Sequence, residues 1–364
     1  MLRYRSLANY LVSKDHKVDV IGYYDLENEL ENGICYIQIK KQFSFGALVW
    51  FLRLLIAHLY LFKNMNLSRY LNRIGLAAIT LALANKLNRA NRYESCLISI
   101  APWAYYMIVD RIRKDTRVIV DICDPLYKNA IYPGSDSDAN LRLEKRALEV
   151  AGLIITVNEP SITIMTGEMR INPNKIRFIS PAIHIDQYLC GGKKQYCFCN
   201  PISMIYSGSL YEGYRDLNEF IPALESCGGI TLDVYTGSKC RPKDTSIVRV
   251  HEIIPHQEIV HLYQKFDLLL FVDNFYGYQV PSKIFELIAQ NKPIIFVYDK
   301  RNVYFYNLLK NQEGIVFVEN DRKRIKEALQ IILSQRNQVV NYTIDLSKYS
   351  EETINNQLYN CIIS

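Results

Sequence analysis

The segment from Tyr278 to Glu286 contains residue types that could bind a diphosphate and a ribose. Its sequence, YQVPSKIFE, places Pro281 where a helix would begin, because a proline in the first turn sacrifices no intrahelical hydrogen bond. The backbone N–H groups of Ser282 and Lys283, the positive end of the helix dipole and the Lys283 ammonium would then converge on one point, which suits a diphosphate. Glu286 would lie one turn further along the same face, where its carboxylate could accept hydrogen bonds from ribose hydroxyls.

A second segment suggests the same chemistry. The apolar run 202–207 predicts a strand that ends in the sequence GSLYEGYRD, with a helix beginning near Arg215. Gly208 and Gly213 would let the backbone approach a ligand closely, and Arg215 would present its planar, permanently charged guanidinium group to a phosphate. Either segment alone is weak evidence, since a glycine after a strand is usually just a turn. Together they favour a nucleotide diphosphate as ligand.

The elements around these segments alternate between strands and helices. The continuous apolar run 267–272 is typical of a strand that is buried on both faces. Further strands are expected at 230–235, ending in Thr236 and Gly237, and at 247–250, 293–297 and 314–318, and helices at 256–266, 302–310 and 321–333. Such alternation predicts a doubly wound parallel sheet, which binds its ligands at the carboxyl ends of its strands.

Residues 200–335 resemble the donor-binding domain of the retaining GT-B glycosyltransferases, the group 1 or family 4 class. Arg215 falls where that family has its second basic phosphate ligand, and Ser209 falls where the first, usually an arginine, is expected. Glu286 matches the second carboxylate of the family's Glu-x7-Glu element, which holds the donor ribose. Tyr278 stands in place of the first, which puts in doubt any role assigned to that carboxylate. The VPSKIFE version of the element is familiar from the branch that builds bacterial surface polysaccharides.

The resemblance implies an α/β protein of the GT-B fold, in which two Rossmann-like, doubly wound parallel-sheet domains face a cleft. It implies a glycosyltransferase that uses a UDP- or GDP-linked sugar as donor and a glycan or polyprenyl-diphosphate-linked glycan as acceptor, with retention. The pathway would be capsule, O-antigen or exopolysaccharide synthesis. No cofactor or metal is required if cations neutralise the departing diphosphate. Catalysis is assigned to Arg215, Lys283 and Glu286, and donor binding to Gly208, Ser209, Gly237, Ile254, Tyr278, Pro281 and Ser282.

The N-terminal half reads as a second α/β domain. A helix at 1–13 and a strand at 16–21 follow the pattern that, in the family, comes after a first strand and a glycine-rich loop. The chain starts inside that helix, so we expect the first strand and the loop to be missing. Asp121 and Asp124, in a D-x-x-D-P turn, could orient an acceptor or merely cap a helix. The expected domains are 1–190 and 191–345, with a C-terminal helix in 346–364 that crosses back to the first domain.

Basic charge is concentrated in one part of the chain. No acidic residue occurs between Glu31 and Glu94, while nine lysines and arginines do. The apolar, aromatic run 43–62 within this span is interrupted by Arg53, whose charge would be costly inside a bilayer. We therefore expect segment 39–93 to lie on an anionic membrane surface rather than to span it. An ordinary amphipathic helix with a solvated basic face is the alternative. No nucleic-acid-binding module accompanies the charge.

The cysteine content predicts where the protein is located, and two residues leave other functions open. Nine cysteines scattered along the chain are typical of a reducing cytoplasm, and with the basic segment they predict a cytoplasmic protein at the inner face of the cell membrane. Two other functions stay open. One is a catalytically degenerate GT-B scaffold or partner subunit, which Ser209 and Tyr278 would favour. The other is a sugar-nucleotide epimerase, for which we find no convincing set of acid–base side chains.

Overall fold

The computed structural model describes residues 2–22, 30–31, 33–38, 93–100, 103–112, 114–132, 134–182, 194–196, 198, 200–335, 340–342 and 349–364. The chain divides into two compact units. Unit 1 comprises residues 1–128, 134–180 and 355–364, and unit 2 comprises residues 129–133 and 181–354. The basic segment 39–93 lies outside the described residues except for Tyr93.

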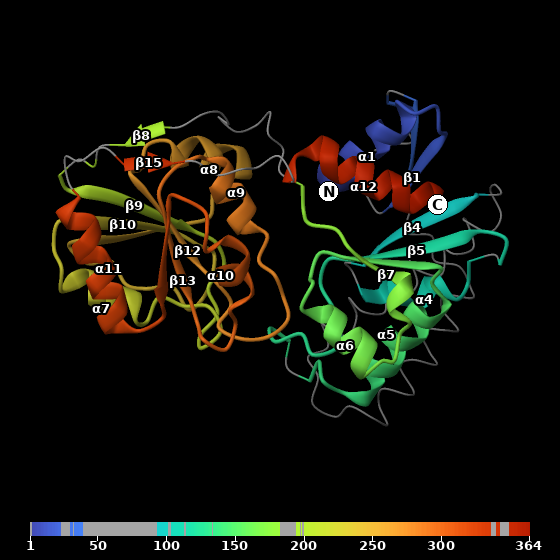
Figure 1. Ribbon diagram of the computed structural model, residues 1–364, viewed down its shortest axis with the longest axis horizontal. Coiled ribbons are helices and arrows are strands. Elements are labelled where there is room, and N and C mark those ends of the chain that lie inside the picture. The colour runs from blue at the N-terminus through green and yellow to red at the C-terminus, as the bar shows by residue number, and fades with distance from the viewer. Residues whose placement is uncertain are drawn as a thin grey trace. The chain divides into compact units, whose positions relative to one another are not determined.

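Unit 2 is built on a six-stranded sheet in which every pair of neighbours is parallel (Figure 1). Its order is β11-β10-β9-β12-β13-β14, so β9, the first of these strands in sequence, lies in the middle. The strands are β9 (Ile202–Ser207), β10 (Ile230–Tyr235), β11 (Val248–His251), β12 (Leu268–Val272), β13 (Ile294–Tyr298) and β14 (Ile315–Glu319). The predicted doubly wound parallel sheet is confirmed. Its strand order reverses between β9 and β12, and the crevice at such a point is where open α/β sheets bind ligands.

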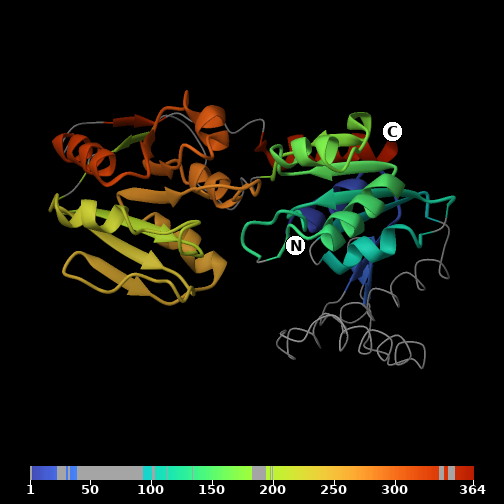
Figure 2. The same ribbon diagram turned by 90° about the horizontal axis from the view of Figure 1, so that it is seen from below.

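Helices cover both faces of this sheet because its strands are apolar on both sides (Figures 1 and 2). In β12, Leu268, Leu270 and Val272 pack with α7 and α11, while Leu269 and Phe271 pack with α8, α9 and α10. All five side chains are buried, as expected for a strand covered on both faces. The helices are α7 (Phe220–Glu225), α8 (His256–Tyr263), α9 (Lys283–Ala289), α10 (Tyr304–Leu309) and α11 (Arg322–Ser334). The short strands β8 (Lys194–Tyr196) and β15 (Val340–Tyr342) pair antiparallel.

The helix predicted to begin near Arg215 begins instead at Phe220, so that prediction is wrong. Arg215 lies in a tight turn, where its backbone N–H and carbonyl pair with the carbonyl and N–H of Tyr211, both at 2.8 Å. The Asp216 carboxylate stabilises this turn, because it accepts hydrogen bonds from the backbone N–H groups of Gly213 at 2.7 Å and Asn218 at 3.0 Å. Aspartates that bond to nearby backbone in this way favour turns over helices.

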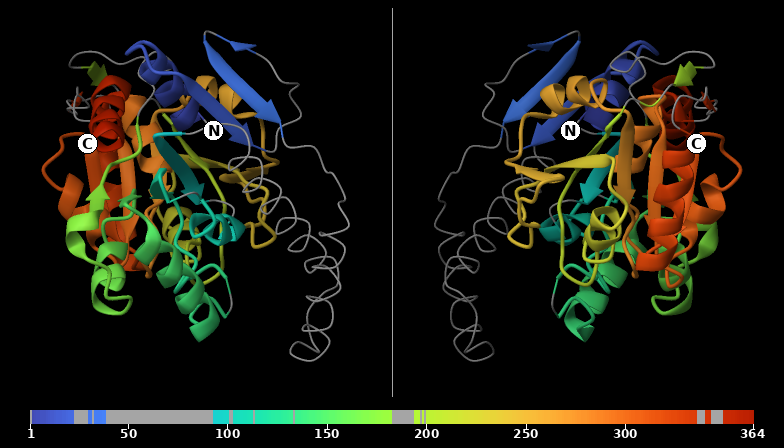
Figure 3. Two further views of the ribbon diagram at one scale, coloured as in Figure 1. Left: turned by 90° about the vertical axis from the view of Figure 1, so that its right-hand side faces the viewer. Right: turned by 90° about the vertical axis from the view of Figure 1, so that its left-hand side faces the viewer.

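In the described part of unit 1, the strands form two sheets. One has the parallel order β4-β5-β6-β7, and the other the order β1-β3-β2 (Figure 3). The strands are β1 (Val18–Gly22), β2 (Leu30–Glu31), β3 (Ile34–Gln38), β4 (Ser95–Ile100), β5 (Arg117–Ile122), β6 (Leu153–Thr156) and β7 (Ile176–Phe178). The main helices are α1 (Leu2–Val12), α4 (Tyr106–Val109), α5 (Asp138–Val150) and α6 (Ser161–Gly167).

The C-terminal helix α12 (Glu351–Ile363) begins in unit 2 and ends in unit 1. Its unit 1 part lies beside α1, where the Asn355 side-chain amide donates to the Ser6 hydroxyl at 2.7 Å (Figure 1). The Arg117 guanidinium, on β5, donates to the backbone carbonyl of Ile362 at 3.0 Å. Polar contacts thus hold the end of the chain to both α1 and the four-stranded sheet. No helix among the described residues is long and apolar enough to cross a membrane.

Candidate functional site

The turn after β9 brings the backbone of Gly208 and Ser209 to the carboxyl edge of the unit 2 sheet. The Gly208 N–H extends the pairing with β10 by donating to the carbonyl of Tyr235 at 3.1 Å. The buried Tyr206 hydroxyl donates to the carbonyl of Ser209 at 3.1 Å. The Ser209 side chain is exposed, and it supplies no charge at the position where the family resemblance implies an arginine.

Arg215 lies next to a buried acid that the sequence analysis did not single out. Asp273 directly follows β12 and is fully buried, and burial raises its pKa to about 8 even though the Asn274 N–H and the Arg215 charge lower it. Among the described residues, the buried atoms Arg215 Nε, Asp273 Oδ2 and Asn274 Oδ1 have no hydrogen-bond partner. Burial thus favours the neutral form of Asp273, and a neutral acid would leave the positive charge of Arg215 for an anionic ligand.

The start of α9 carries the predicted lysine and glutamate as a contacting pair. The Lys283 ammonium lies 3.0 Å from Glu286 Oε1, one turn further along the helix, and the two side chains are 27% and 13% exposed. Ser282 precedes the helix, and its side chain makes no capping hydrogen bond. The cation that we assign to a diphosphate and the carboxylate that we assign to a ribose therefore hold each other in place.

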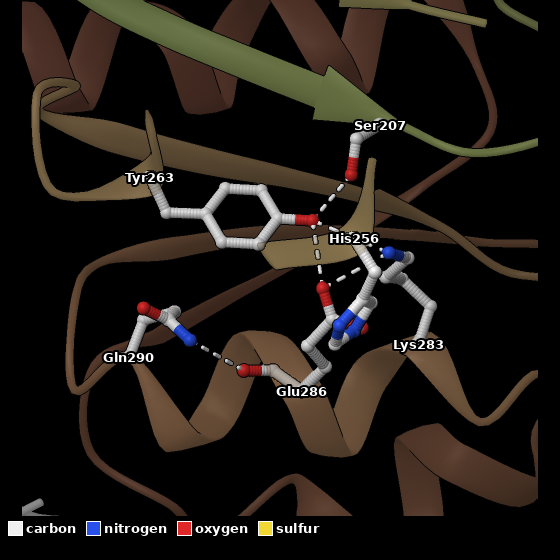
Figure 4. A network of polar contacts seen from close by, with 6 residues as sticks. All are labelled: Ser207, His256, Tyr263, Lys283, Glu286 and Gln290. Atoms are coloured by element: carbon white, nitrogen blue, oxygen red, sulfur yellow. Dashed lines mark hydrogen bonds and ion pairs between the residues drawn. The ribbon is translucent and has the colours of Figure 1, made fainter. Parts of the chain in front are cut away.

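The Tyr263 hydroxyl joins the β9 turn to the start of α9, as Figure 4 shows. It contacts the Ser207 hydroxyl, on the last residue of β9, and it donates to Glu286 Oε1 at 3.1 Å. On the other side of the carboxylate, His256 Nε2 lies 3.1 Å from Glu286 Oε2. The two segments singled out in the sequence therefore meet at the carboxyl edge of the sheet, where a parallel sheet was expected to place them.

A pocket of about 730 Å³ opens at the same carboxyl edge of unit 2. This volume lies within the range that small-molecule sites usually have. The lining comes from the loops after β9, β10, β11 and β12 and from the 129–133 segment of unit 2: Ala130, Ile131, Ser209, Leu210, Tyr211, Glu212, Tyr214, Gly237, Ser238, Lys239, Cys240, Ile253 and Tyr276. The lining combines aromatic and aliphatic side chains with polar and charged ones.

The remaining predicted donor residues lie on these loops, with different exposures. Gly237 and Ser209 line the pocket. Ile254 packs against the buried cluster under α8 and α9, whereas its neighbour Ile253 is 75% exposed and lines the pocket. Tyr278 and Pro281 are half-buried in the loop before α9. The sequence pattern alone could not separate Ile253 from Ile254, because both belong to one short apolar turn.

Gly277, in the loop between β12 and α9, fits only a residue without a side chain. Its φ is +93°, and a Cβ there would lie 3.1 Å from the Ala130 Cβ. We expect Gly277→Ala to lower the free energy of unfolding by about 1–3 kcal/mol, from the left-handed backbone and the close methyl contact together. Chemical denaturation followed by circular dichroism measures this loss. Gly228→Ala is the matched control, because Gly228 has φ +65° and open space around its Cβ position. Equal losses in the two variants would contradict the contact with Ala130.

Asp121 and Asp124 belong to unit 1. Asp121 is fully buried in β5, where its Oδ2 accepts from the Tyr4 hydroxyl at 3.1 Å. Asp124 follows the strand, and its backbone carbonyl accepts from the Trp103 indole N–H at 3.0 Å. In the part of the chain that the structure describes, no three His, Cys, Asp or Glu side chains are grouped as metal ligands would be.

Comparison with solved structures identifies the architecture. Sucrose-phosphate synthase from Thermosynechococcus elongatus matches 100% of this chain and 93% of its own, with TM-score 0.64 and 13% identity. HepE from Anabaena, solved with UDP and glucose, matches 100% of this chain and 95% of its own, with TM-score 0.65 and 14% identity. A glycosyltransferase from Rickettsia africae matches 99% of this chain and 90% of its own, with TM-score 0.60 and 13% identity. The chain has the GT-B fold. No family model matches it, and no curated protein matches it in sequence.

The GT-B architecture accounts for the placement of the site in unit 2. Its polar and charged groups, and the pocket, lie at the carboxyl ends of parallel strands, beside the reversal of strand order between β9 and β12. Several groups at this edge were not predicted as site residues: Ser207, Tyr263, Asp273 and Tyr276 were not considered, and His256 was interpreted as a surface or turn residue. Of these residues, Asp273 could have been found from the sequence, since an acid directly after an apolar strand lies at the ligand-binding edge of a parallel sheet.

Proposed function

We propose that this GT-B chain transfers a sugar from a nucleotide-diphosphate sugar to a glycan or lipid-linked glycan acceptor. The observation that supports it most is the convergence of Lys283 and Glu286 with the end of β9 at the carboxyl edge of the sheet. A pocket large enough for a nucleoside opens at the same edge. Glu286 would accept hydrogen bonds from the ribose, and Lys283 and Arg215 would neutralise the diphosphate. The HepE structure, solved with UDP and glucose, favours UDP as the first nucleotide to test, with GDP second.

In this proposal catalysis is mainly electrostatic. The bond between the sugar and the diphosphate breaks, and negative charge grows on the departing phosphate oxygens. Positive groups that are already in place stabilise that charge more strongly in the transition state than in the ground state. Burial raises the pKa of Asp273, and in its neutral form this acid would not compete with the diphosphate for the charge of Arg215. Retention of anomeric configuration, a role in surface-polysaccharide synthesis and an acceptor role for Asp124 belong to the same proposal through the family resemblance. Asp121 is fully buried, so it has no exposed carboxylate to offer an acceptor.

The acceptor side of the proposal rests on composition. The acid-free, basic and aromatic segment 39–93 would bring the protein to an anionic membrane surface at the cytoplasmic face, where a polyprenyl-diphosphate-linked glycan would be available. The proposed partners are therefore a nucleotide sugar and a lipid-linked or free glycan, and no nucleic acid.

The proposal is tested by calorimetric titration of UDP and GDP into the wild type and Glu286→Ala. We expect micromolar binding of one nucleotide and a loss of at least tenfold, about 1.4 kcal/mol, in the variant, because a ribose would lose its charged acceptor. Glu327→Ala is the control, since Glu327 is 45% exposed on α11, which covers the other face of the sheet. Binding of neither nucleotide by the folded wild type would contradict the donor site.

A catalytically degenerate GT-B scaffold is the second candidate. Two observations favour it: neither Ser209 nor Tyr278 supplies the charge that the family resemblance implies at these positions. A scaffold would tolerate Glu286→Ala without loss of its partner, whereas a transferase would lose sugar transfer. A sugar-nucleotide epimerase is a weaker candidate, because it needs acid–base groups aimed at the sugar ring.

A further inference from the structure

The Tyr263 hydroxyl makes polar contacts with three side chains of the proposed nucleotide site. The residue ends α8 and is fully buried, so its ring cannot move out of the way of a ligand. Its hydroxyl lies 3.1 Å from Glu286 Oε1 and 3.4 Å from the Lys283 ammonium, and it contacts the Ser207 hydroxyl (Figure 4). One oxygen atom thus connects the end of β9 to both charged residues at the start of α9.

Among the described contacts of the Tyr263 hydroxyl, counting donors and acceptors gives one consistent set of hydrogen-bond directions. A tyrosine hydroxyl has one proton to donate and two lone pairs to accept with. The Glu286 carboxylate has no proton, so it receives the proton of Tyr263. Lys283 has only donors, so it donates to the Tyr263 oxygen. Because the tyrosine proton is already used, the Ser207 hydroxyl donates the third bond. Each of the three contacts therefore has a compatible donor and acceptor, with no competition among them.

The same count shows which face of Glu286 a ligand can use. Oε1 accepts from both Tyr263 and Lys283, which occupies its two lone pairs. Oε2 accepts from His256, whose side chain is 46% exposed, and this leaves one lone pair among the described contacts. The carboxylate cannot rotate without breaking the Oε1 bonds. A ribose hydroxyl would therefore meet Oε2, in an orientation that Tyr263 determines from the buried side.

We propose that Tyr263 is a positioning residue of the nucleotide site. Its hydroxyl holds the Glu286 carboxylate in the orientation that receives the ribose, holds the Lys283 ammonium beside it, and ties both to the strand end from which the Gly208 turn departs. This inference rests on the proposed function, because it assigns Tyr263 to the same nucleotide-diphosphate site. It adds that recognition of the ribose hydroxyls depends on a side chain that need not touch the ligand.

The test compares UDP with 2′,3′-dideoxy-UDP on the wild type and Tyr263→Phe, with GDP and its dideoxy analogue if the wild type prefers GDP. The phenylalanine keeps the buried ring and removes only the hydroxyl. We expect Tyr263→Phe to weaken UDP binding about tenfold more than it weakens dideoxy-UDP binding, since a misoriented Glu286 matters only to a ligand that has ribose hydroxyls. A residue with a merely structural role would weaken both nucleotides equally.

Two further variants complete the test. Ser207→Ala removes one hydrogen bond to Tyr263 and leaves its ring and hydroxyl. We expect it to weaken UDP binding more than dideoxy-UDP binding, as Tyr263→Phe does, but by a smaller factor. This variant replaces Tyr263→Phe if that protein does not fold. Tyr298→Phe is the matched control, because Tyr298 lies in β13 of the same sheet and stacks on Tyr306, at 4.7 Å between ring centroids. It should bind as the wild type does.

The outcomes separate the inference from the proposed function. If the wild type binds neither UDP nor GDP, the proposed function fails and the inference fails with it. Suppose instead that the wild type prefers UDP to its dideoxy analogue. If Tyr263→Phe and Ser207→Ala then bind the two nucleotides with wild-type affinity, or lose the same affinity for each, only the positioning role is overturned. A loss confined to the nucleotide with ribose hydroxyls supports it.

Discussion

Replacing Lys283 with alanine should lower the rate of sugar transfer by about 100-fold, which is the typical effect of removing one preorganised charge-stabilising group. The Lys283 side chain is 27% exposed, and Glu286 and Tyr263 hold its ammonium in place. It therefore needs little reorganisation when charge develops on the departing diphosphate. Because that charge is larger in the transition state than in the bound donor, kcat should fall more than the affinity for the nucleotide.

The measurement is the steady-state release of nucleoside diphosphate from the sugar nucleotide that the wild type binds, with Lys300→Ala as the matched control. Lys300 is 77% exposed and pairs with Glu319 at 2.9 Å, and α9 and β13 separate it in sequence from the loop before α9. The control should keep the wild-type rate. A Lys283→Ala protein that releases the diphosphate at the wild-type rate would contradict the assignment of this lysine to the leaving group.

The parallel sheet of unit 2 was predictable because its strands are short, apolar and separated by helices. The run 267–272 could be recognised from composition alone, since a strand covered on both faces shows no polar alternation. The structure places Leu268–Val272 in β12, at the position next to β9. Two strands that are neighbours in a parallel sheet end at the same edge, so the meeting of the Gly208 turn with the start of α9 followed from the fold class.

The features that the sequence did not predict depend on two kinds of contact. One is a hydrogen bond between a side chain and the nearby backbone, and the other is a contact between residues that are distant in sequence. The helix expected near Arg215 fails because Asp216 bonds to the backbone of Gly213 and Asn218, and the apolar periodicity carries no trace of that bond. Tyr263 looked like an ordinary core residue of an amphipathic helix. Its role depends on Ser207, 56 residues earlier, and on Glu286, 23 residues later, and neither separation has a local sequence signature.

The stability of unit 1 should fall as the pH rises from about 4.5 to about 7, because of one buried carboxyl group. Glu144, on α5, is fully buried, and it accepts hydrogen bonds from the backbone N–H groups of Leu126 at 3.1 Å and Tyr127 at 2.7 Å and from the Tyr106 hydroxyl at 2.8 Å. Burial raises the pKa of Glu144 from 4.5 to about 7, although the three hydrogen bonds lower it. The side chain therefore anchors the loop that follows β5.

The sign of the effect follows from proton binding. Because the folded state holds this proton more tightly than the unfolded state does, the native protein binds more protons between pH 4.5 and 7, and raising the pH then favours unfolding. The contribution is fully present below about pH 4.5 and is lost as the pH rises through about 7. A pKa increase of this size corresponds to about 3 kcal/mol, since each pKa unit is worth about 1.4 kcal/mol.

Glu144→Gln should remove this pH dependence while keeping the loop in place. The amide oxygen can accept from the N–H groups of Leu126 and Tyr127, and the amide N–H can donate to the Tyr106 hydroxyl, which can also accept. Relative to the wild type, the variant should gain about 3 kcal/mol of unfolding free energy between pH 4.5 and pH 8. The two tryptophans of the chain, Trp50 and Trp103, both fall within the residues of unit 1. Urea unfolding followed by tryptophan fluorescence therefore measures this unit.

Glu149→Gln is the matched control, because Glu149 lies on the same helix, is 56% exposed and pairs only loosely with Lys145 at 3.7 Å. Other carboxyl groups titrate over the same range, but they do so equally in the wild type and in both variants, so the difference between proteins isolates Glu144. Parallel pH profiles for Glu144→Gln and the wild type would show that the buried carboxyl does not take up its proton in this window. A profile for Glu144→Gln that is flatter than those of the wild type and Glu149→Gln would show that this one side chain sets the pH dependence of the unit.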